Sequence, residues 1–143
     1  MGRSDGCAPS PKPLPMAMKN EESNIQSACV GWFRYRWPAY AGVFFSVPNG
    51  GRRDKVTGAV LKREGALAGV SDLLLLVARG GFHGLCIEMK AGKGRQQDSQ
   101  RRFEGNVAEQ GYCYVVCRSL EEFMERVDAY MEGRLQPVDV SRS

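Results

Sequence analysis

Two apolar segments separated by a pair of glycines constrain the fold of this 143-residue chain more than any other feature. Residues 72–78 carry apolar side chains on both faces of the expected strand, as strands at the centre of a sheet do. Residues 84–90 alternate, so that Glu88 and Lys90 leave the face opposite to the apolar one. Because Gly80-Gly81 provides a turn between the segments, the sequence predicts a hairpin within a sheet.

The remaining periodicity predicts helices and strands on both sides of this hairpin. Further strands are expected at residues 42–47 and 112–117, and helices at residues 20–37, 55–64, 97–110 and from Ser119 onward. Asn20 is the expected cap of the first helix, and Ser119 with Glu122 forms a capping box at the last. This order predicts an α/β fold, a small sandwich whose mixed sheet of about four strands is flanked by helices.

The length of the chain suits one domain, which we expect at residues 19–132. Four of the seven prolines fall within residues 1–18, which are predicted to form a disordered, proline-rich arm. Residues 133–143 are predicted to be a flexible tail.

The composition excludes several classes of protein. With 43% hydrophobic and 25% charged residues, the chain is not collagen-like, a disulfide scaffold or wholly disordered. No apolar run approaches the roughly 20 residues that cross a bilayer, and no secretory signal is visible, so we expect no membrane partner. The five cysteines are an odd, scattered set, which favours reduced thiols in a cytoplasmic protein.

The net charge of +4 is unevenly distributed along the chain. Residues 49–102 hold eleven Lys or Arg against five Asp or Glu, whereas the residues from Phe103 onward are acidic overall. A localised basic segment of this kind can neutralise several phosphates of a nucleic acid. The alternative is that these Lys and Arg side chains only keep the surfaces of helices and loops in contact with water.

The most informative chemistry in the sequence is the combination of Asp72, Glu88 and Lys90. Glu88 and Lys90 share one face of a strand that otherwise belongs to the core, and buried charges of this kind are paired or bind a metal. If Asp72 meets Glu88 across the hairpin, the two carboxylates make an oxygen-rich site for a hard cation such as Mg²⁺. Lys90 could then stabilise negative charge, or orient and deprotonate a water. The alternative for such an E-x-K pattern is a surface salt bridge.

The register of the hairpin sets a condition on this site. A plain two-residue loop at Gly80-Gly81 would pair Arg79 with Phe82 and Asp72 with Met89, which would place Asp72 on the wrong face. The sequence therefore predicts an odd-length connection or a β-bulge in this hairpin.

Asp72, the run Glu88-Met89-Lys90 and Gln100 resemble the PD-(D/E)XK nuclease pattern. From about residue 20 to residue 131, the sequence is similar to the VRR-NUC (virus-type replication-repair nuclease) family, in its single-domain phage-like version. The matching strings are ESNIQ (22–26), VPNGG (47–51), LKREG (61–65), GVSD (69–72), IEMK (87–90), GRQQDSQ (94–100) and GY (111–112). Ser71 stands where the family usually has a proline that shapes the entry to the strand, so we expect this departure to be tolerated.

The resemblance implies a restriction-endonuclease-like fold and hydrolysis of phosphodiester bonds that depends on Mg²⁺ or Mn²⁺, with no organic cofactor. It implies that Asp72, Glu88 and the main-chain carbonyl of Met89 hold the metal, and that Lys90 positions the attacking water or stabilises the transition state. Glu22 would reach the site from the first helix, directly or through a water.

Gln26 and Gln100 would support the metal or a phosphate. The basic residues expected to contact DNA, together with Gln26, are Arg52, Arg53, Lys62, Lys93, Arg95 and Arg101. Single-domain phage members of the family are similar to Holliday-junction resolvases that act as homodimers on branched DNA, and this implies the same partner and assembly here. Two alternatives remain at this point: a non-catalytic DNA-binding or assembly module that retained the fold, and an intracellular protein-interaction domain.

Several other residues favour structural roles over chemical ones. His83 is expected at the surface rather than in a proton shuttle, and Cys113 and Cys117 in the core rather than in a zinc site. The aromatic residues near the end of the first helix are expected to pack in the core or an interface rather than to stack on unpaired bases: Trp32, Tyr35, Trp37 and Tyr40.

Overall fold

The computed structural model describes residues 16–48 and 55–137. Its centre is a four-stranded sheet in the order β1 (Phe44–Ser46), β2 (Leu73–Leu75), β3 (Leu85–Met89) and β4 (Cys113–Cys117). The first two pairings are antiparallel and the pairing of β3 with β4 is parallel. The predicted mixed sheet of four strands is thus confirmed.

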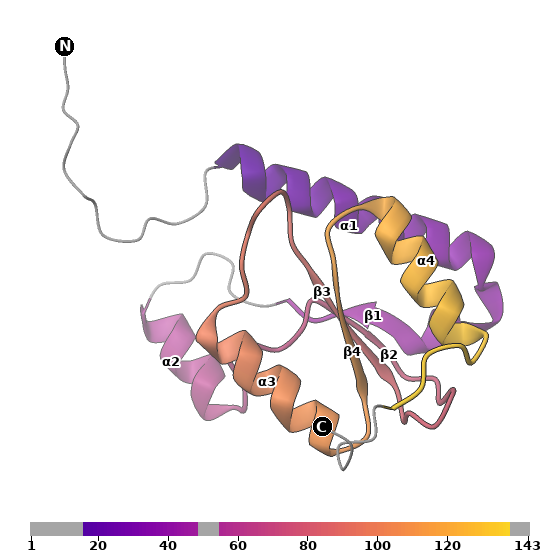
Figure 1. Ribbon diagram of the computed structural model, residues 1–143. Coiled ribbons are helices and arrows are strands. Elements are labelled where there is room, and N and C mark those ends of the chain that lie inside the picture. The colour runs from indigo at the N-terminus through magenta and orange to yellow at the C-terminus, as the bar shows by residue number, and fades with distance from the viewer. Residues whose placement is uncertain (1–15, 49–54, 138–143) are drawn as a thin grey trace.

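Helices cover both faces of this sheet. The helical elements are α1 (Met16–Arg36), the 3₁₀ helix η1 (Pro38–Val43), α2 (Lys55–Arg63), α3 (Asp98–Glu109) and α4 (Leu120–Met131). Figure 1 shows α1 and α4 side by side on one face, and α3 on the other. The chain therefore has the predicted α/β sandwich architecture. Within residues 16–48 and 55–137, no helix combines the length and the apolar composition that crossing a membrane requires.

Several boundaries differ from the sequence-based expectation. The strands β1 and β2 are shorter than the segments predicted at residues 42–47 and 72–78, and η1 was not predicted. The helix α1 begins at Met16, so Asn20 lies inside the helix and is not its cap, and residues 16–18 are not part of an unstructured arm. At the other end, residues 133–137 pack back onto the hairpin turn, where the Leu135 carbonyl occupies the space that a Cβ on Gly80 would need. In contrast, Ser119 caps α4 as predicted, because its hydroxyl accepts a hydrogen bond from the Glu122 N–H. The second half of the predicted capping box differs, because the Glu122 carboxylate accepts from the Arg118 N–H and not from the Ser119 N–H.

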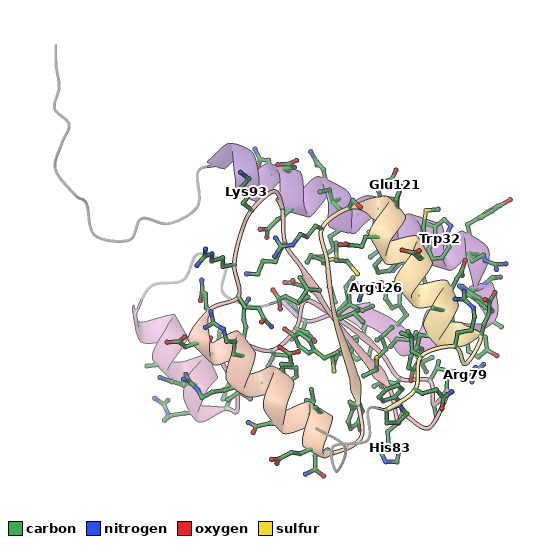
Figure 2. All side chains as sticks on the ribbon, viewed as in Figure 1. Trp32, Arg79, His83, Lys93, Glu121 and Arg126 are labelled. Carbon is green, nitrogen blue, oxygen red and sulfur yellow. The ribbon has the colours of Figure 1, made fainter. Side chains whose placement is uncertain are left out.

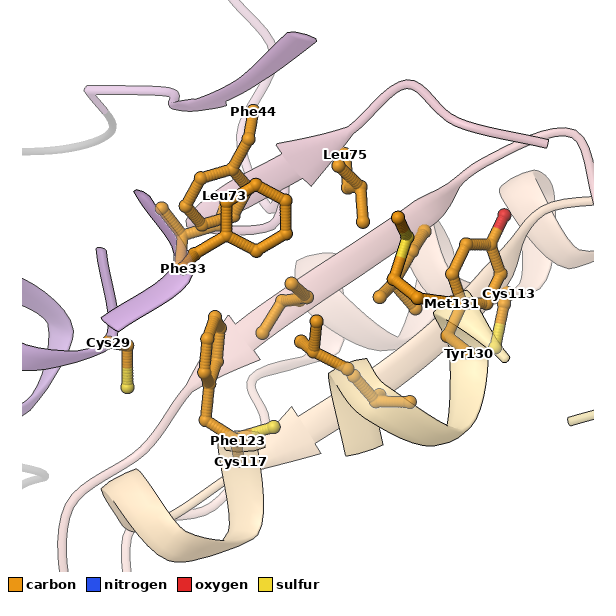
Figure 3. Packing of buried hydrophobic residues seen from close by; sticks show 14 of the residues in the cluster. Cys29, Phe33, Phe44, Leu73, Leu75, Cys113, Cys117, Phe123, Tyr130 and Met131 are labelled. Atoms are coloured by element: carbon orange, nitrogen blue, oxygen red, sulfur yellow. The ribbon is translucent and has the colours of Figure 1, made fainter. Parts of the chain in front are cut away.

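One continuous core lies between the sheet and the α1–α4 layer (Figure 3). Alternate strand residues such as Leu73, Leu75 and Ile87 point into it and are fully buried. Phe33 of α1 stacks on Phe44 of β1 with ring centroids 4.1 Å apart, which joins the first helix to the edge strand.

The cysteines and aromatic residues largely have the structural roles predicted for them. Cys113 and Cys117 are buried, and burial is the main reason that the pKa of Cys117 rises to about 12, so this thiol stays protonated and unreactive. Trp32, Trp37 and Tyr40 pack partly buried against the core. Tyr35 differs, since 86% of it is exposed.

The hairpin between β2 and β3 contains the predicted irregularity. At its open end Leu73 pairs with Ile87 and Leu75 with Leu85, whereas next to the turn Arg79 pairs with Phe82. Three residues, 76–78, therefore oppose only two, 83–84, which is the extra residue of a β-bulge. This bulge sets the register of the functional residues.

Candidate active site

Asp72 and Glu88 lie opposite each other at the ends of β2 and β3. The pair stands one position beyond Leu73 and Ile87 in the register. The Asp72 carboxylate is held in place by the backbone, because its Oδ2 accepts a hydrogen bond of 2.7 Å from the Met89 N–H. The two carboxylates thus share the face of the sheet that α3 covers.

Glu88 is buried, with 2% of its surface exposed, and its two oxygens have different surroundings. Oε2 accepts a hydrogen bond of 2.8 Å from Gln100 Nε2 and lies 3.9 Å from Lys90 Nζ. Oε1 is also buried and has no hydrogen-bond partner within the described residues. An unpartnered buried oxygen is costly, so this atom indicates a place for a cation or another ligand.

The electrostatics of the site favour a neutral Glu88 when no cation is present. Burial, followed by the negative charge of Asp72, raises the pKa of Glu88 to about 9. Lys90 opposes this rise, and Glu22 adds to it. Lys90 itself is only 8% exposed, so its ammonium group sits beside the carboxylates with little screening by water.

Gln100 and Glu22 reach the site from two helices. Gln100 is oriented at both ends of its amide, since its Oε1 accepts from the Gln97 N–H at 2.7 Å and its Nε2 donates to Glu88. These contacts combine a capping box at the start of α3 with a contact to the buried carboxylate. Glu22 of α1 accepts a hydrogen bond of 3.2 Å from the Ala91 N–H, just after β3.

The donor set suits a hard divalent cation completed by water. Within residues 16–48 and 55–137, no three His, Cys, Asp or Glu side chains gather closely enough to enclose a metal by themselves. Mg²⁺ needs only one or two carboxylates and keeps several waters. The unpartnered Oε1 of Glu88, the carboxylate of Asp72 and a strand carbonyl therefore fit such an ion.

Comparisons with known proteins identify the family of this chain. The model of the VRR-NUC domain family matches residues 20–121, which is more than half of the chain. The chain belongs to the VRR-NUC family. A solved structure described as a VRR_NUC domain protein is 26% identical, with a TM-score of 0.68, and the similarity covers 78% of this chain and 88% of that one. No curated protein matches the sequence.

VRR-NUC domains are nucleases of the PD-(D/E)XK type, so the family assignment makes this chain a member of a hydrolytic nuclease family. The pattern residues Asp72, Glu88, Lys90 and Gln100 meet at one place in the fold. At the departure from the usual motif, Ser71 is fully buried and its hydroxyl donates to the Leu73 carbonyl at 3.3 Å. The serine thus fits the start of β2.

A basic loop follows the site in this VRR-NUC domain. Lys93 and Arg95 are exposed on it, and Figure 2 shows Lys93 near the first half of α1. The loop backbone is held by Arg118, whose Nη1 donates to the carbonyl oxygens of Gly92 at 3.1 Å and Gly94 at 2.7 Å. The positive φ of Gly92, 53°, allows the turn that brings these carbonyls together.

The other predicted DNA contacts lie on α1, α2 and α3 or outside the described residues. Gln26 lies on α1 one turn after Glu22, and Lys62 is exposed near the end of α2. Arg101 is exposed on α3 and forms an ion pair of 2.7 Å with Asp98. Arg52 and Arg53 fall outside the described residues.

Sequence reasoning missed four residues that support the site. Gln96 donates to the Glu104 carboxylate at 3.0 Å and to the Tyr114 hydroxyl at 3.2 Å, and Arg118 holds the basic loop. These contacts join residues that are distant in sequence, and no spacing rule indicates them. His83, in contrast, is exposed as predicted and lies at the end of the molecule opposite to Lys93 (Figure 2).

Proposed function

We propose that this protein is an endodeoxyribonuclease that depends on Mg²⁺ or Mn²⁺ and hydrolyses phosphodiester bonds in branched or structured DNA. The observation that carries the proposal is the buried, unpartnered Oε1 of Glu88, which lies beside Asp72 and next to the ammonium group of Lys90. A site of this kind is suited to a cation that a substrate phosphate can join.

The cation would be held by Asp72, Glu88 and the main-chain carbonyl of Met89. Once bound, it would act as a Lewis acid on the scissile phosphate. Asp72 is pre-oriented for this role by the Met89 N–H, and Gln100 fixes Glu88 so that Oε1 remains available. Glu22 fixes the backbone that follows β3 through the Ala91 N–H.

Lys90 supplies the positive charge that the reaction requires from the protein. Its ammonium group can donate hydrogen bonds to the attacking water and to a phosphate oxygen that gains negative charge. Because Lys90 is almost fully buried, this stabilisation is stronger than it would be in water. The exposed cations around the site would then bind the flanking phosphates: Lys62, Lys93, Arg95 and Arg101, together with Arg52 and Arg53.

We extend the proposal to the assembly, because one site cuts one strand. A homodimer with two-fold symmetry would present two such sites and could cut both strands of a DNA junction symmetrically. This arrangement suits a role in phage or prophage DNA replication or repair, and it would operate in the cytoplasm.

The experiment is a cleavage panel of four-way junction, flap, splayed and linear DNA, with and without Mn²⁺. The wild type should cut at least one branched substrate only when the metal is present. Glu88→Ala and Lys90→Ala should abolish cleavage while folding and DNA binding survive. Absence of all cleavage by a folded wild type that still binds DNA would favour the alternative, a non-catalytic DNA-binding or assembly module.

A further inference from the structure

A groove of about 790 Å³ runs along α1 beside the edge strand β1, and neither Asp72 nor Glu88 lines it. Glu22 stands at one end of it and Arg34 at the other. Arg34 follows Glu22 by twelve positions in α1, which is a distance of about 18 Å along the helix. Glu22 also accepts a hydrogen bond from the Ala91 N–H just after β3, so this end of the groove lies next to the candidate active site.

The helical wall of the groove is low and polar. Ser23, Ser27 and Gly31 follow one another at successive turns of α1, and Gln26 lies beside them. A Cβ placed on Gly31 would have no atom within 4 Å, so packing does not require glycine at this position. Glycine inside a helix lowers stability by up to about 1 kcal/mol relative to alanine. At position 31 it leaves open space along the groove.

The opposite wall is the open edge of the sheet. The Val47 N–H donates to the Asp72 carbonyl, and the Leu76 N–H donates to the Val43 carbonyl. In an antiparallel edge strand, the backbone N–H groups of alternate residues point away from the neighbouring strand. Since the Val47 N–H and the Val43 carbonyl face β2, the N–H of Ser46 faces away from it. Phe44 lines the groove, and its ring packs on the buried Phe33 of α1, so the two walls are in contact there.

We infer that this groove binds the single strand of DNA that flanks the scissile phosphate, an inference that rests on the proposed nuclease function. Serine hydroxyls, a glutamine amide, an outward backbone N–H and an arginine are the groups that contact phosphates without reading sequence. Arg34 lines the groove, whereas its neighbour Arg36 is held by Asp128 at 3.3 Å. The groove is long enough for several successive phosphates of a single strand.

A single strand fits these observations better than a duplex or a peptide. The two walls belong to elements that are in direct contact through Phe33 and Phe44, so the space between them suits one chain. A peptide added to the edge of a sheet also needs pockets for alternate side chains. This groove combines small polar groups with Val30, Phe44 and Phe45, and 43% of Phe45 is exposed. An exposed aromatic ring beside groups that bind phosphates is suited to stacking on a base of a single strand.

The test compares three variants of the full-length protein. Gly31→Leu fills the groove, and Gly31→Ala makes the same backbone change without filling it. Ala28→Leu adds the three carbons by which Gly31→Leu exceeds Gly31→Ala, on an exposed part of α1 that does not line the groove. Fluorescence anisotropy in EDTA then gives the affinity for a labelled oligothymidylate and for a blunt duplex.

We expect Gly31→Leu to bind the oligothymidylate about tenfold more weakly than Gly31→Ala, the loss of one or two phosphate contacts. Ala28→Leu should bind like the wild type, and no variant should change the affinity for the blunt duplex. For the single strand, Arg34→Gln should make the fall of the log binding constant with log salt concentration less steep, by about 0.7 in the slope.

Equal affinities of Gly31→Leu and Gly31→Ala for the oligothymidylate would overturn the inference. It would also be overturned if Gly31→Leu altered only the oligomeric state, since the groove would then hold a second copy of the chain. If no DNA is cleaved but the Gly31→Leu effect on binding appears, the proposed nuclease function fails and the groove assignment stands. If DNA is cleaved but Gly31→Leu binds the oligothymidylate as tightly as Gly31→Ala does, the groove assignment fails and the proposed nuclease function stands.

Discussion

Asp72 lies directly opposite Glu88 because the hairpin that joins their strands has one more residue on the β2 side than on the β3 side. Without that residue, the pairing of Arg79 with Phe82 would extend to place Asp72 against Met89, on the other face of the sheet. The bulge thus decides whether two carboxylates meet. It lies at residues 76–78, several residues away from the site itself.

Replacement of Glu88 should stabilise the metal-free protein at neutral pH. Its pKa rises from an ordinary 4.5 to about 9 in the folded state, so the folded chain holds a proton that the unfolded chain releases between these values. Its contribution to the free energy of unfolding is therefore complete at low pH and falls as the pH rises through this window. Glu88→Gln should gain about 2–4 kcal/mol at pH 7.5 and lose cleavage.

Urea unfolding of the wild type and Glu88→Gln from pH 4 to pH 9 in EDTA measures this difference. The two free energies of unfolding should converge near pH 4.5 and separate as the pH rises. A constant difference across the range would show that Glu88 does not hold a proton in the folded protein. Excess Mg²⁺ should narrow the gap at pH 7.5, because a bound cation replaces the proton of the wild type.

Gln100 should affect catalysis through the orientation of Glu88. Gln100→Ala removes the donor to Glu88 Oε2, and the loss of such a partner behind a metal ligand costs about 10–100-fold in metal affinity or activity. Gln97→Ala is the matched control, since it removes the other half of the same capping box and does not contact Glu88.

Both variants should lose about 1 kcal/mol of stability from the cap. Only Gln100→Ala should require more Mn²⁺ for half-maximal cleavage. The positioning role would be contradicted by equal metal dependence in the two variants.

Arg118 should determine how well the basic loop binds DNA. Arg118→Ala releases the carbonyls of Gly92 and Gly94, so the cations Lys93 and Arg95 lose their fixed position. We expect KM for DNA to rise about fivefold while kcat changes little, and Arg118→Lys to restore part of the loss.

Ser119→Ala serves as the control, because it breaks the neighbouring cap of α4 and leaves the loop contacts intact. Its stability should fall by about 1 kcal/mol with KM unchanged. An equal rise in KM for Ser119→Ala would show that the effect comes from general destabilisation.

The sheet and the pairing of the carboxylates could be predicted because they depend on local patterns. Alternation in residues 84–90 gave the strand and its two faces, and the side chains of Leu85, Ile87 and Met89 do lie in the core. The bulge could be predicted because only one register of the hairpin brings Asp72 and Glu88 together on the same face of the sheet. The start of α1 could not be predicted, because the first turn of the helix lies before Asn20, the polar residue that was expected to cap it.

The supporting contacts of the site were beyond prediction for a physical reason. Arg118 and the loop that it holds are more than twenty residues apart, and the network of Gln96 with Tyr114 forms only when α3 packs on β4. Such contacts depend on tertiary packing, so the hydrophobic periodicity of the sequence does not predict them. Gln100 was predicted through the family pattern, but its capping role became visible only in the structure.

Anomalous diffraction from crystals soaked in Mn²⁺ would locate the cation directly. We expect a peak at the ends of β2 and β3, within ligand distance of Glu88 Oε1, Asp72 and the Met89 carbonyl. The peak should vanish in Glu88→Gln. A well-occupied peak elsewhere, or occupancy at this site that is unchanged in Glu88→Gln, would contradict the proposed metal site.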